Sequence, residues 1–175
     1  MISLESSNPK YNSIVFENSH SLIDDINQRV RYFLENLGLF IPYEKISVCF
    51  ITQDEMKKHD SSATGLCVYN DDGTYTIYIS CGYTYMYTKS VLAHELGHAW
   101  LRENKVNICK IENEGFCQLL SYQILSYDYN PQSNLEMLKL ANWEDKVYGN
   151  GFRLMKRKLD SLGWEQLILF LTMTM

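Results

Sequence analysis

The sequence predicts an α+β fold in which a small mixed sheet packs against helices. Two kinds of pattern predict it: short apolar or alternating runs typical of strands, and longer runs with apolar residues every three or four positions, typical of helices. The 175 residues are 46% hydrophobic, which argues against disorder and allows a core of ordinary size. We therefore expect one domain over residues 1–175.

The first half of the chain holds one expected helix and two expected strands. Apolar residues recur at helical spacing over 22–37, with Ser21 as the expected cap and Gly38 as the stop. Segment 46–51 has the composition of a buried strand, and segment 74–79 alternates like a second one. The second strand either offers an exposed edge to an extended peptide or is internal, with both edges paired.

The second half of the chain is expected to be mainly helical. Its expected elements are a helix starting near Thr88 or Ser90, a helix over about 112–126, a helix over about 133–146 after a break at Pro131, and a final helical region after 148–153. Residues 1–20 show no comparable pattern.

Charge and composition exclude several classes of protein. The formal charge is −5 and long basic runs are absent, so nothing favours nucleic-acid binding. No stretch approaches the roughly 18 continuous apolar residues of a membrane span, and no leader pattern opens the chain, so we expect a cytoplasmic protein that does not enter a membrane. The five cysteines form no C-x-x-C pair, which predicts neither a disulfide framework nor a thiolate zinc finger.

The sequence H-E-L-G-H at 94–98 lies inside an apolar stretch with helical spacing. Residues four apart share one face of a helix, so His94 and His98 can bind one metal ion while Glu95 stands beside them as a general base. A helix with two incidental histidines is the plainer alternative. The pattern favours a zinc site, because all three positions that the chemistry needs are filled.

A catalytic zinc ion normally takes three protein ligands, and the third is expected about one loop later in the chain. Glu112 and Glu114 both lie at the start of an expected second helix. If that helix runs antiparallel to the first, either glutamate can reach the metal. Glu112 is equally explained as a first-turn acid at the positive end of that helix. Gln118, one turn after Glu114, is either an acceptor for the second ring nitrogen of a zinc-bound histidine or a polar residue on the helix flank.

Four separated motifs resemble the peptidase domain of the DA-one family, the plant LIM-domain peptidases, and its shorter relatives over roughly residues 46–160. They are Thr64-Gly65-Leu66-Cys67, Leu92-Ala93-His94-Glu95 through His98-Ala99-Trp100-Leu101-Arg102, Glu114-Gly115-Phe116-Cys117-Gln118 and Tyr148-Gly149-Asn150-Gly151-Phe152-Arg153. The resemblance implies a zincin-like (gluzincin) fold, with the sheet packed on an active-site helix and a glutamate-ligand helix and with C-terminal helices beyond. It also implies Zn²⁺ held by His94, His98 and Glu114.

The resemblance further implies a zinc-dependent endopeptidase that acts on a protein or peptide substrate, with Glu95 as general base. The LIM and ubiquitin-interacting regions of the plant proteins are absent here. The family commonly has a pair of acids directly before this glycine, and this chain has Asn113 at the first position of the pair and Glu114 at the second. Tyr148 is a candidate second donor to the oxyanion, with a structural Tyr-Gly turn as the alternative. Two other functions remain open: a catalytically silent zinc-binding interaction module, and a non-proteolytic zinc amidohydrolase.

Overall fold

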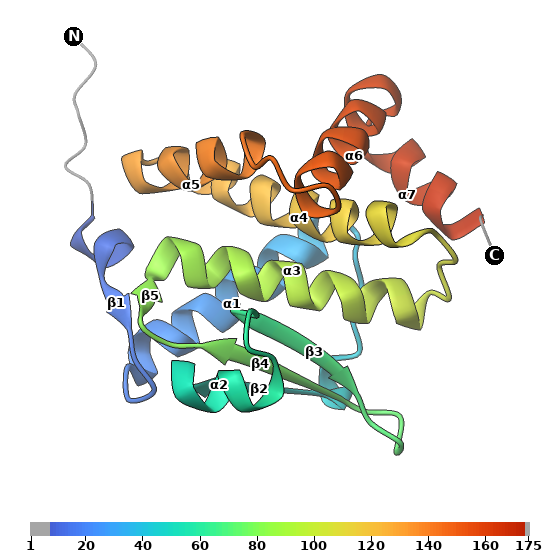
Figure 1. Ribbon diagram of the computed structural model, residues 1–175. Helices are drawn as coiled ribbons and strands as arrows, with labels where there is room; N and C mark the ends of the chain where they lie inside the picture. The colour runs from blue at the N-terminus through green and yellow to red at the C-terminus, as the bar shows by residue number, and fades with distance from the viewer. Residues whose placement is uncertain (1–7, 174–175) are drawn as a thin grey trace, which may run out of the picture.

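The computed structural model describes residues 8–173, which form an α+β arrangement. In chain order the elements are η1 (Pro9–Asn12), β1 (Ile14–Val15), α1 (His20–Asn36), η2 (Tyr43–Lys45), β2 (Ile46–Ile51), α2 (Gln53–His59), β3 (Gly65–Tyr69), β4 (Tyr75–Ser80), β5 (Tyr83–Thr84), α3 (Tyr85–Glu103), α4 (Lys110–Asp128), α5 (Pro131–Ala141), α6 (Tyr148–Leu162) and α7 (Trp164–Met173). Figure 1 shows this order by colour.

The main sheet has three strands in the order β2-β4-β3. β2 pairs parallel with β4, and β3 pairs antiparallel with β4, so the sheet is mixed, as predicted. The strand expected at 74–79 is therefore the central one, and of the two alternatives for it the internal strand is confirmed. The edge strand on the side of α3 is instead β3, an element that the sequence patterns did not predict.

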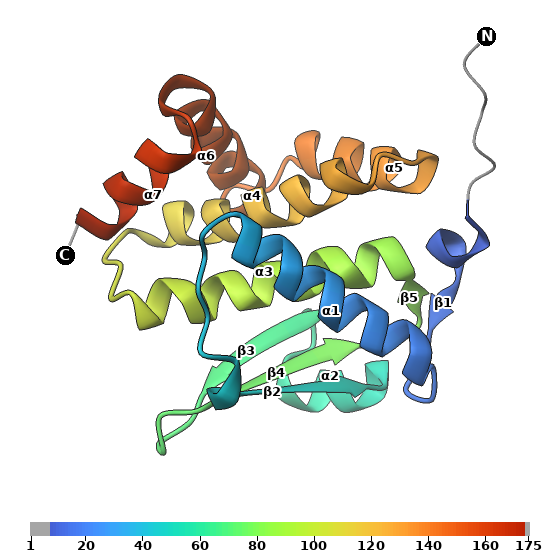
Figure 2. The ribbon, with the colours of Figure 1, turned by 180° about the vertical axis from the view of Figure 1, so that it is seen from behind.

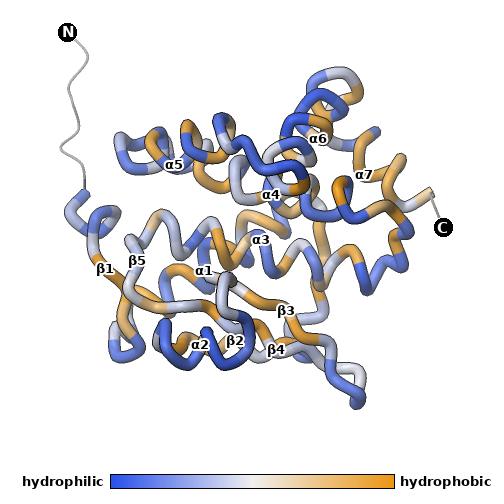
Figure 3. Tube along the Cα trace, viewed as in Figure 1, coloured by the Kyte–Doolittle hydropathy of each residue, from blue (hydrophilic) through white to orange (hydrophobic). Residues whose placement is uncertain are grey.

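Three layers are visible in Figures 1 and 2. The sheet forms one outer layer, α3 and α1 lie in the middle, and α4 to α7 form the other outer layer. On the far face of the sheet, α2 packs through Met56, which is buried, and the rest of this helix is mainly hydrophilic in Figure 3. No helix over residues 8–173 is long and apolar enough to cross a membrane.

Because α3 lies between the sheet and α4, it is buried on most of its sides. Several of its polar residues are buried too, whereas Arg102 near its end is exposed. The helix begins at Tyr85, with the side chain of Thr84 accepting a hydrogen bond from the backbone N–H of Tyr87 at 3.4 Å. The predicted start near Thr88 or Ser90 is wrong. Both hydroxyls lie buried within the helix, and that of Ser90 donates to the carbonyl of Tyr87.

Two later helices also differ from the prediction at their ends. Pro131 is the first residue of α5 rather than a break before it, because a helix leaves its first N–H groups unpaired and tolerates proline there. The helix ends at Ala141, five residues before the predicted end at 146. The segment 148–153 forms the first turns of α6 instead of preceding the helix.

Glycines allow α4 and α6 to touch through their backbones. A Cβ atom on Gly151 would lie 2.3 Å from the carbonyl oxygen of Ile111, and one on Gly115 would lie 2.3 Å from the carbonyl oxygen of Gly151. Both distances are far below a normal carbon–oxygen contact, so only glycine fits at either position. The glycines of the E-G-F and Y-G-N-G-F strings thus bring the helix that carries Glu114 against the helix that carries Tyr148.

Candidate metal centre

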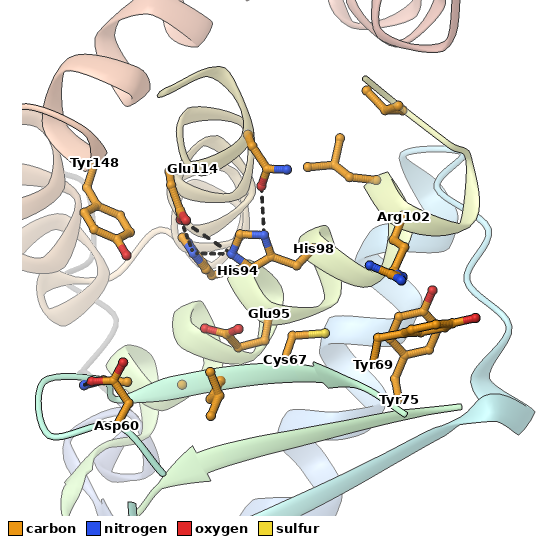
Figure 4. A pocket seen from close by; sticks show the side chains of 16 residues that line it. Asp60, Cys67, Tyr69, Tyr75, His94, Glu95, His98, Arg102, Glu114 and Tyr148 are labelled. Atoms are coloured by element: carbon orange, nitrogen blue, oxygen red, sulfur yellow. Dashed lines mark hydrogen bonds and ion pairs between the residues drawn. The ribbon is translucent and has the colours of Figure 1, made fainter. Parts of the chain in front are cut away.

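The middle of α3 turns two histidines toward the outer helical layer, as Figure 4 shows. His94 and His98 lie one helical turn apart, and their Nε2 atoms are 3.1 Å from each other. The side chain of His94 is 10% exposed and that of His98 is 25% exposed. The spacing in H-E-x-x-H therefore brings the two ring nitrogens together as predicted from the helical period.

The carboxylate of Glu114 completes a triangle of donor atoms. Its Oε2 lies 3.3 Å from Nε2 of His94 and 3.5 Å from Nε2 of His98. Glu112, the other candidate, points elsewhere: its Oε1 accepts from Lys158 on α6 at 2.7 Å, and its Oε2 accepts from the thiol of Cys109. The geometry thus brings Glu114, and not Glu112, to the histidines.

The three donor atoms fit a zinc ion. In a tetrahedral site with bonds of 2.0–2.1 Å, neighbouring donor atoms are about 3.3 Å apart, which is close to the three spacings found here. Oε2 of Glu114 is buried and accepts no hydrogen bond. A buried carboxylate oxygen without a hydrogen bond is costly unless a cation approaches it, so the triangle is arranged for a metal ion.

A neighbouring amide orients one of the histidines. Oδ1 of Asn113 lies 2.9 Å from Nδ1 of His98. If Nδ1 carries the proton and donates to this oxygen, Nε2 keeps its lone pair and faces His94 and Glu114. The sequence shows Asn113 only as a departure from the acid pair of the family. No sequence pattern predicts its contact with His98.

Cys117 belongs to a second possible metal-binding group, since donor atoms of His94, His98 and Cys117 lie within 4.8 Å of one another. Its Sγ is 3.4 Å from Nδ1 of His98, which is the ring nitrogen that Asn113 also contacts. Burial raises the pKa of this thiol, which keeps it protonated at neutral pH. The sulfur therefore contacts Nδ1 of His98, on the far side of the ring from the Nε2 atoms. Glu114 instead contacts the Nε2 atoms of both histidines.

Charges around the triangle favour a cation. Burial alone would raise the pKa of Glu114, but the imidazoles of His94 and His98 beside the carboxylate outweigh it and lower that pKa to about 2. Burial alone would lower the pKa of His98, but the carboxylates of Glu114 and Glu95 act in the opposite direction and raise it. A positive charge between these side chains is therefore stabilised, whether it is carried by protons or by a metal ion.

Glu95 lies on the sheet side of the histidines and is 6% exposed. Burial raises the pKa of its carboxyl group above the usual value, although the two histidines oppose the shift. The strand β3 runs directly beneath it: a Cβ atom on Gly65 would lie 2.6 Å from Oε1 of Glu95. Gly65 thus makes room for this carboxylate. The sequence analysis identified this glycine only as part of a motif and predicted no such role for it.

Two cavities meet at this group of residues. One has a volume of about 520 Å³ and extends toward Tyr69 and Arg102, and the other has about 350 Å³ and extends toward Tyr87 and Trp143. His94, Glu95 and Tyr148 line both cavities. The triangle of donor atoms is therefore open to ligands from two sides of the groove between β3 and the outer helices.

Tyr148 and Gln118, the remaining predicted site residues, both lie at the groove. The ring of Tyr148 stacks on Trp143 with centroids 5.3 Å apart, and its centroid is 6.3 Å from that of His94. Gln118 is buried and lines the smaller cavity beside His94. Among the described residues, Asn113 rather than Gln118 is the acceptor at the second ring nitrogen of His98. A hydrogen bond from His94 to Gln118 stays a prediction.

Comparison with known protein families bears on this part of the chain. Residues 69–139 match the model of the DA1-like family, described as Protein DA1. The match confirms the predicted resemblance over a segment that contains the H-E-x-x-H helix and Glu114. The motifs at 64–67 and 148–153 lie outside it. No curated protein and no solved structure matches the chain.

Proposed function

We propose that this chain, which carries DA1-like sequence over residues 69–139, is a zinc-dependent metallopeptidase with a zincin-like (gluzincin) fold. The observation that carries the proposal is the triangle formed by Nε2 of His94, Nε2 of His98 and Oε2 of Glu114, with all three distances between 3.1 and 3.5 Å. A buried carboxylate, Glu95, stands beside it at an open groove. This combination is what peptide hydrolysis by a metal-activated water requires.

The proposed ligands of one zinc ion are His94, His98 and Glu114. Two imidazoles and one carboxylate are a common ligand set for catalytic zinc, and three protein ligands leave the fourth position open. When bound, the ion supplies a Lewis acid that lowers the pKa of water and withdraws electron density from a carbonyl group. Asn113 keeps the ring of His98 in the orientation that the site needs.

Glu95 is the proposed general base. Its carboxylate takes a proton from the attacking water and later returns it to the amine of the leaving peptide. Burial raises its pKa above that of an exposed glutamate, which makes the carboxylate a better proton acceptor. Gly65 supports this role because its lack of a side chain leaves room for the carboxylate.

Tyr148 is the proposed second donor to the developing oxyanion. Burial raises the pKa of its phenol, so the hydroxyl keeps its proton and donates. Its stacking on Trp143 holds the ring at the groove. In the variant Tyr148→Phe we expect kcat to fall about tenfold to a hundredfold while zinc content stays unchanged. Full turnover in this variant would remove Tyr148 from the mechanism.

The groove supports cleavage within a chain rather than at its end. The free edge of β3 lines the larger cavity through Gly65, Leu66 and Cys67, and such an edge binds an extended peptide by main-chain hydrogen bonds. Because cavities extend to both sides of His94, a peptide has room on both sides of the bond to be cut. We therefore propose an endopeptidase that takes a protein or peptide substrate.

Metal analysis combined with a cleavage assay tests this function. The wild-type chain and the variant Glu95→Gln are loaded with zinc, analysed for metal and incubated with an unfolded protein and a peptide library. We expect about one zinc ion per chain in both proteins and cleavage by the wild type alone, because the substitution removes the base and keeps the ligands. Zinc in both proteins with cleavage by neither supports a silent binding module. Absence of zinc overturns the proposal, and hydrolysis only of non-peptide amides points to an amidohydrolase.

A further inference from the structure

Arg102 lies at the end of the larger cavity, one helical turn beyond His98. Positions 94, 98 and 102 are each four apart, so Arg102 lies on the same face of α3 as the two histidines. Its guanidinium carbon is 3.8 Å from the centroid of the Tyr69 ring on β3. Figure 4 shows the guanidinium group above this ring at the side of the cavity beyond His98.

Arg102 forms no salt bridge with a carboxylate among residues 8–173, and its only carboxylate interaction there is a coulombic one with Glu103. The neighbouring acid, Glu103, is already engaged: its Oε2 accepts from Lys45 at 3.2 Å, and its Oε1 accepts from the hydroxyl of Tyr75 at 2.8 Å. Of the described residues that line the larger cavity, Arg102 is the only lysine or arginine. The guanidinium group is therefore held by the tyrosine ring, with its N–H groups still available to a ligand.

This arrangement suits a carboxylate. A guanidinium group stacked on an aromatic ring is fixed in its plane, and its N–H edge matches the two oxygens of a carboxylate. The opposite end of the groove has the opposite charge: Asp60 lines both cavities and lies away from Arg102 in Figure 4, and Asp145 lines the smaller cavity. An acidic group on a peptide in the groove is thus attracted to the Arg102 end and repelled from the other end.

We propose that Arg102, positioned by Tyr69, is a specificity-determining residue that binds an aspartate or glutamate side chain of the substrate. The inference rests on the proposed peptidase function. Arg102 lies about 9 Å along the helix axis from the midpoint of the two histidines, given a rise of about 1.5 Å per residue. An extended peptide advances about 3.4 Å per residue, so the acid is the second or third residue from the scissile bond.

The direction of β3 tells on which side the acid lies. Gly65, at the start of the strand, lies against Glu95, and Tyr69, at its end, lies against Arg102. Antiparallel pairing is the more stable mode, and a peptide paired in this way runs from the Arg102 end toward the Gly65 end. The preferred acid therefore stands on the amino-terminal side of the bond that is cut.

Matched peptides measure the preference. Two peptides are compared that differ only by Glu or Gln at the second and third positions before a mapped cleavage site. We expect the wild type to have a kcat/KM about tenfold higher for the Glu peptide, because one charge-assisted, bidentate contact is gained. The Glu/Gln ratio should fall toward one in Arg102→Gln. A third peptide with Lys at the same positions should be cleaved faster than the Glu peptide by Arg102→Glu. Salt should reduce the wild-type ratio.

Arg31→Gln is the control variant. Arg31 also lies over a tyrosine ring, 4.3 Å from the centroid of Tyr43, but it lines neither cavity. This variant loses the same charge and the same kind of stacking, and it should keep the wild-type ratio. An equal fall of the ratio in Arg31→Gln, or an unchanged ratio in Arg102→Gln, overturns the assignment to Arg102.

A binding measurement separates this inference from the peptidase proposal. Zinc-loaded Glu95→Gln is titrated with fluorescent Glu and Gln peptides, with and without the additional Arg102→Gln change. The same tenfold ratio is expected in Kd, and it should disappear with Arg102. Failure of the wild type to cleave any peptide contradicts the proposed function alone, because the ratio of the two dissociation constants still tests Arg102. Equal binding of both peptides, or binding of neither, contradicts the inference.

Discussion

The side-chain oxygen of Asn113 lies 2.9 Å from Nδ1 of His98, on the side of the ring opposite the other two donor atoms. The two residues come from different helices, α4 and α3. Asn113 immediately precedes Glu114, so one short stretch of α4 supplies both a proposed zinc ligand and the group that orients another one.

The Asn113 contact predicts graded effects on zinc affinity. In Asn113→Leu, His98 loses its acceptor, and we expect zinc to bind about 10- to 100-fold more weakly. In Asn113→Asp, a carboxylate replaces the amide oxygen and makes His98 a more basic ligand, so affinity should equal or exceed that of the wild type. Competition with a chromogenic chelator measures both. Equal affinity in Asn113→Leu and the wild type would remove the contact from the metal site.

The two glutamates of α4 should differ sharply in their effect on metal binding. Glu114→Gln removes the carboxylate that faces the histidines and should lower zinc affinity by at least about a hundredfold, since one of three ligands is lost. Glu112→Gln is the matched control, because it lies two residues earlier and pairs with Lys158. Metal content after dialysis against a weak chelator distinguishes them. Retention of zinc by Glu114→Gln and its loss by Glu112→Gln would reverse the assignment.

Gly65→Ala should impair turnover without removing the metal. The added methyl group would lie 2.6 Å from both Oε1 of Glu95 and Cγ1 of Val91, so both side chains have to shift and the carboxylate leaves its place in the groove. Misplacement of a catalytic group by about 1 Å can cost about a hundredfold in rate. We expect a fall of this order in kcat, with zinc content and thermal unfolding close to the wild type. Wild-type turnover would show that the carboxylate adapts and that Gly65 is not needed for it.

Gly151→Ala tests the backbone contact between α4 and α6. Replacing glycine by alanine inside a helix normally stabilises it by about 1 kcal/mol, because alanine has the higher helix propensity. Here the new Cβ would lie 2.3 Å from the carbonyl oxygen of Ile111, and the helices must separate. We expect the free energy of unfolding to fall by about 1–3 kcal/mol. Urea denaturation gives the sign directly, and an increase in stability would rule out the close approach.

The Glu112–Lys158 pair predicts a pH dependence of stability. The Lys158 ammonium group, 2.7 Å from Oε1, lowers the pKa of Glu112 below its usual value of 4.5. A pKa lowered by folding stabilises the folded state above the unfolded pKa, and this contribution is lost as the pH falls through the folded pKa. Lys158→Met should therefore cost about 1 kcal/mol at pH 7 and much less near pH 3.

Urea unfolding of the wild type and Lys158→Met at both pH values measures this difference. Lys156→Met serves as the control, since Lys156 lies on the same helix and pairs with Asp160 on that helix alone. A cost of Lys158→Met that is the same at both pH values would mean that the lysine contributes through packing instead of through its charge.

Local patterns predicted the elements whose faces differ strongly in hydropathy. The strand 46–51 was predicted at its observed bounds because it is a short, nearly continuous apolar run. The first helix was predicted within two residues of its bounds because its apolar residues repeat with the helical period. The start of α3 was missed because buried tyrosine and methionine residues continue the apolar pattern of the preceding strand, and Thr84, its cap, differs little from the later hydroxyl residues.

The site was predictable as far as it depends on spacing along one helix or on a motif. His94, Glu95 and His98 follow from the helical period, and Glu114 from the resemblance. The contacts of Asn113, Gly65 and Arg102 each join segments far apart in the chain, and no local pattern encodes how those segments dock. The strand β3 was missed for the same reason: it is recognised as a strand through its pairing with β4, and this pairing cannot be read from a local pattern.

The position of β3 has a consequence for what the groove can admit. One edge of this strand pairs with β4, and the other lines a cavity whose opposite wall is formed by α4 and α6. These helices cover the free edge of β3, and a covered edge is less available for edge-to-edge pairing with another sheet. Under the proposed peptidase function, a folded target would have to expose a loop or terminus first, so its degradation rate would follow its own equilibrium of local opening.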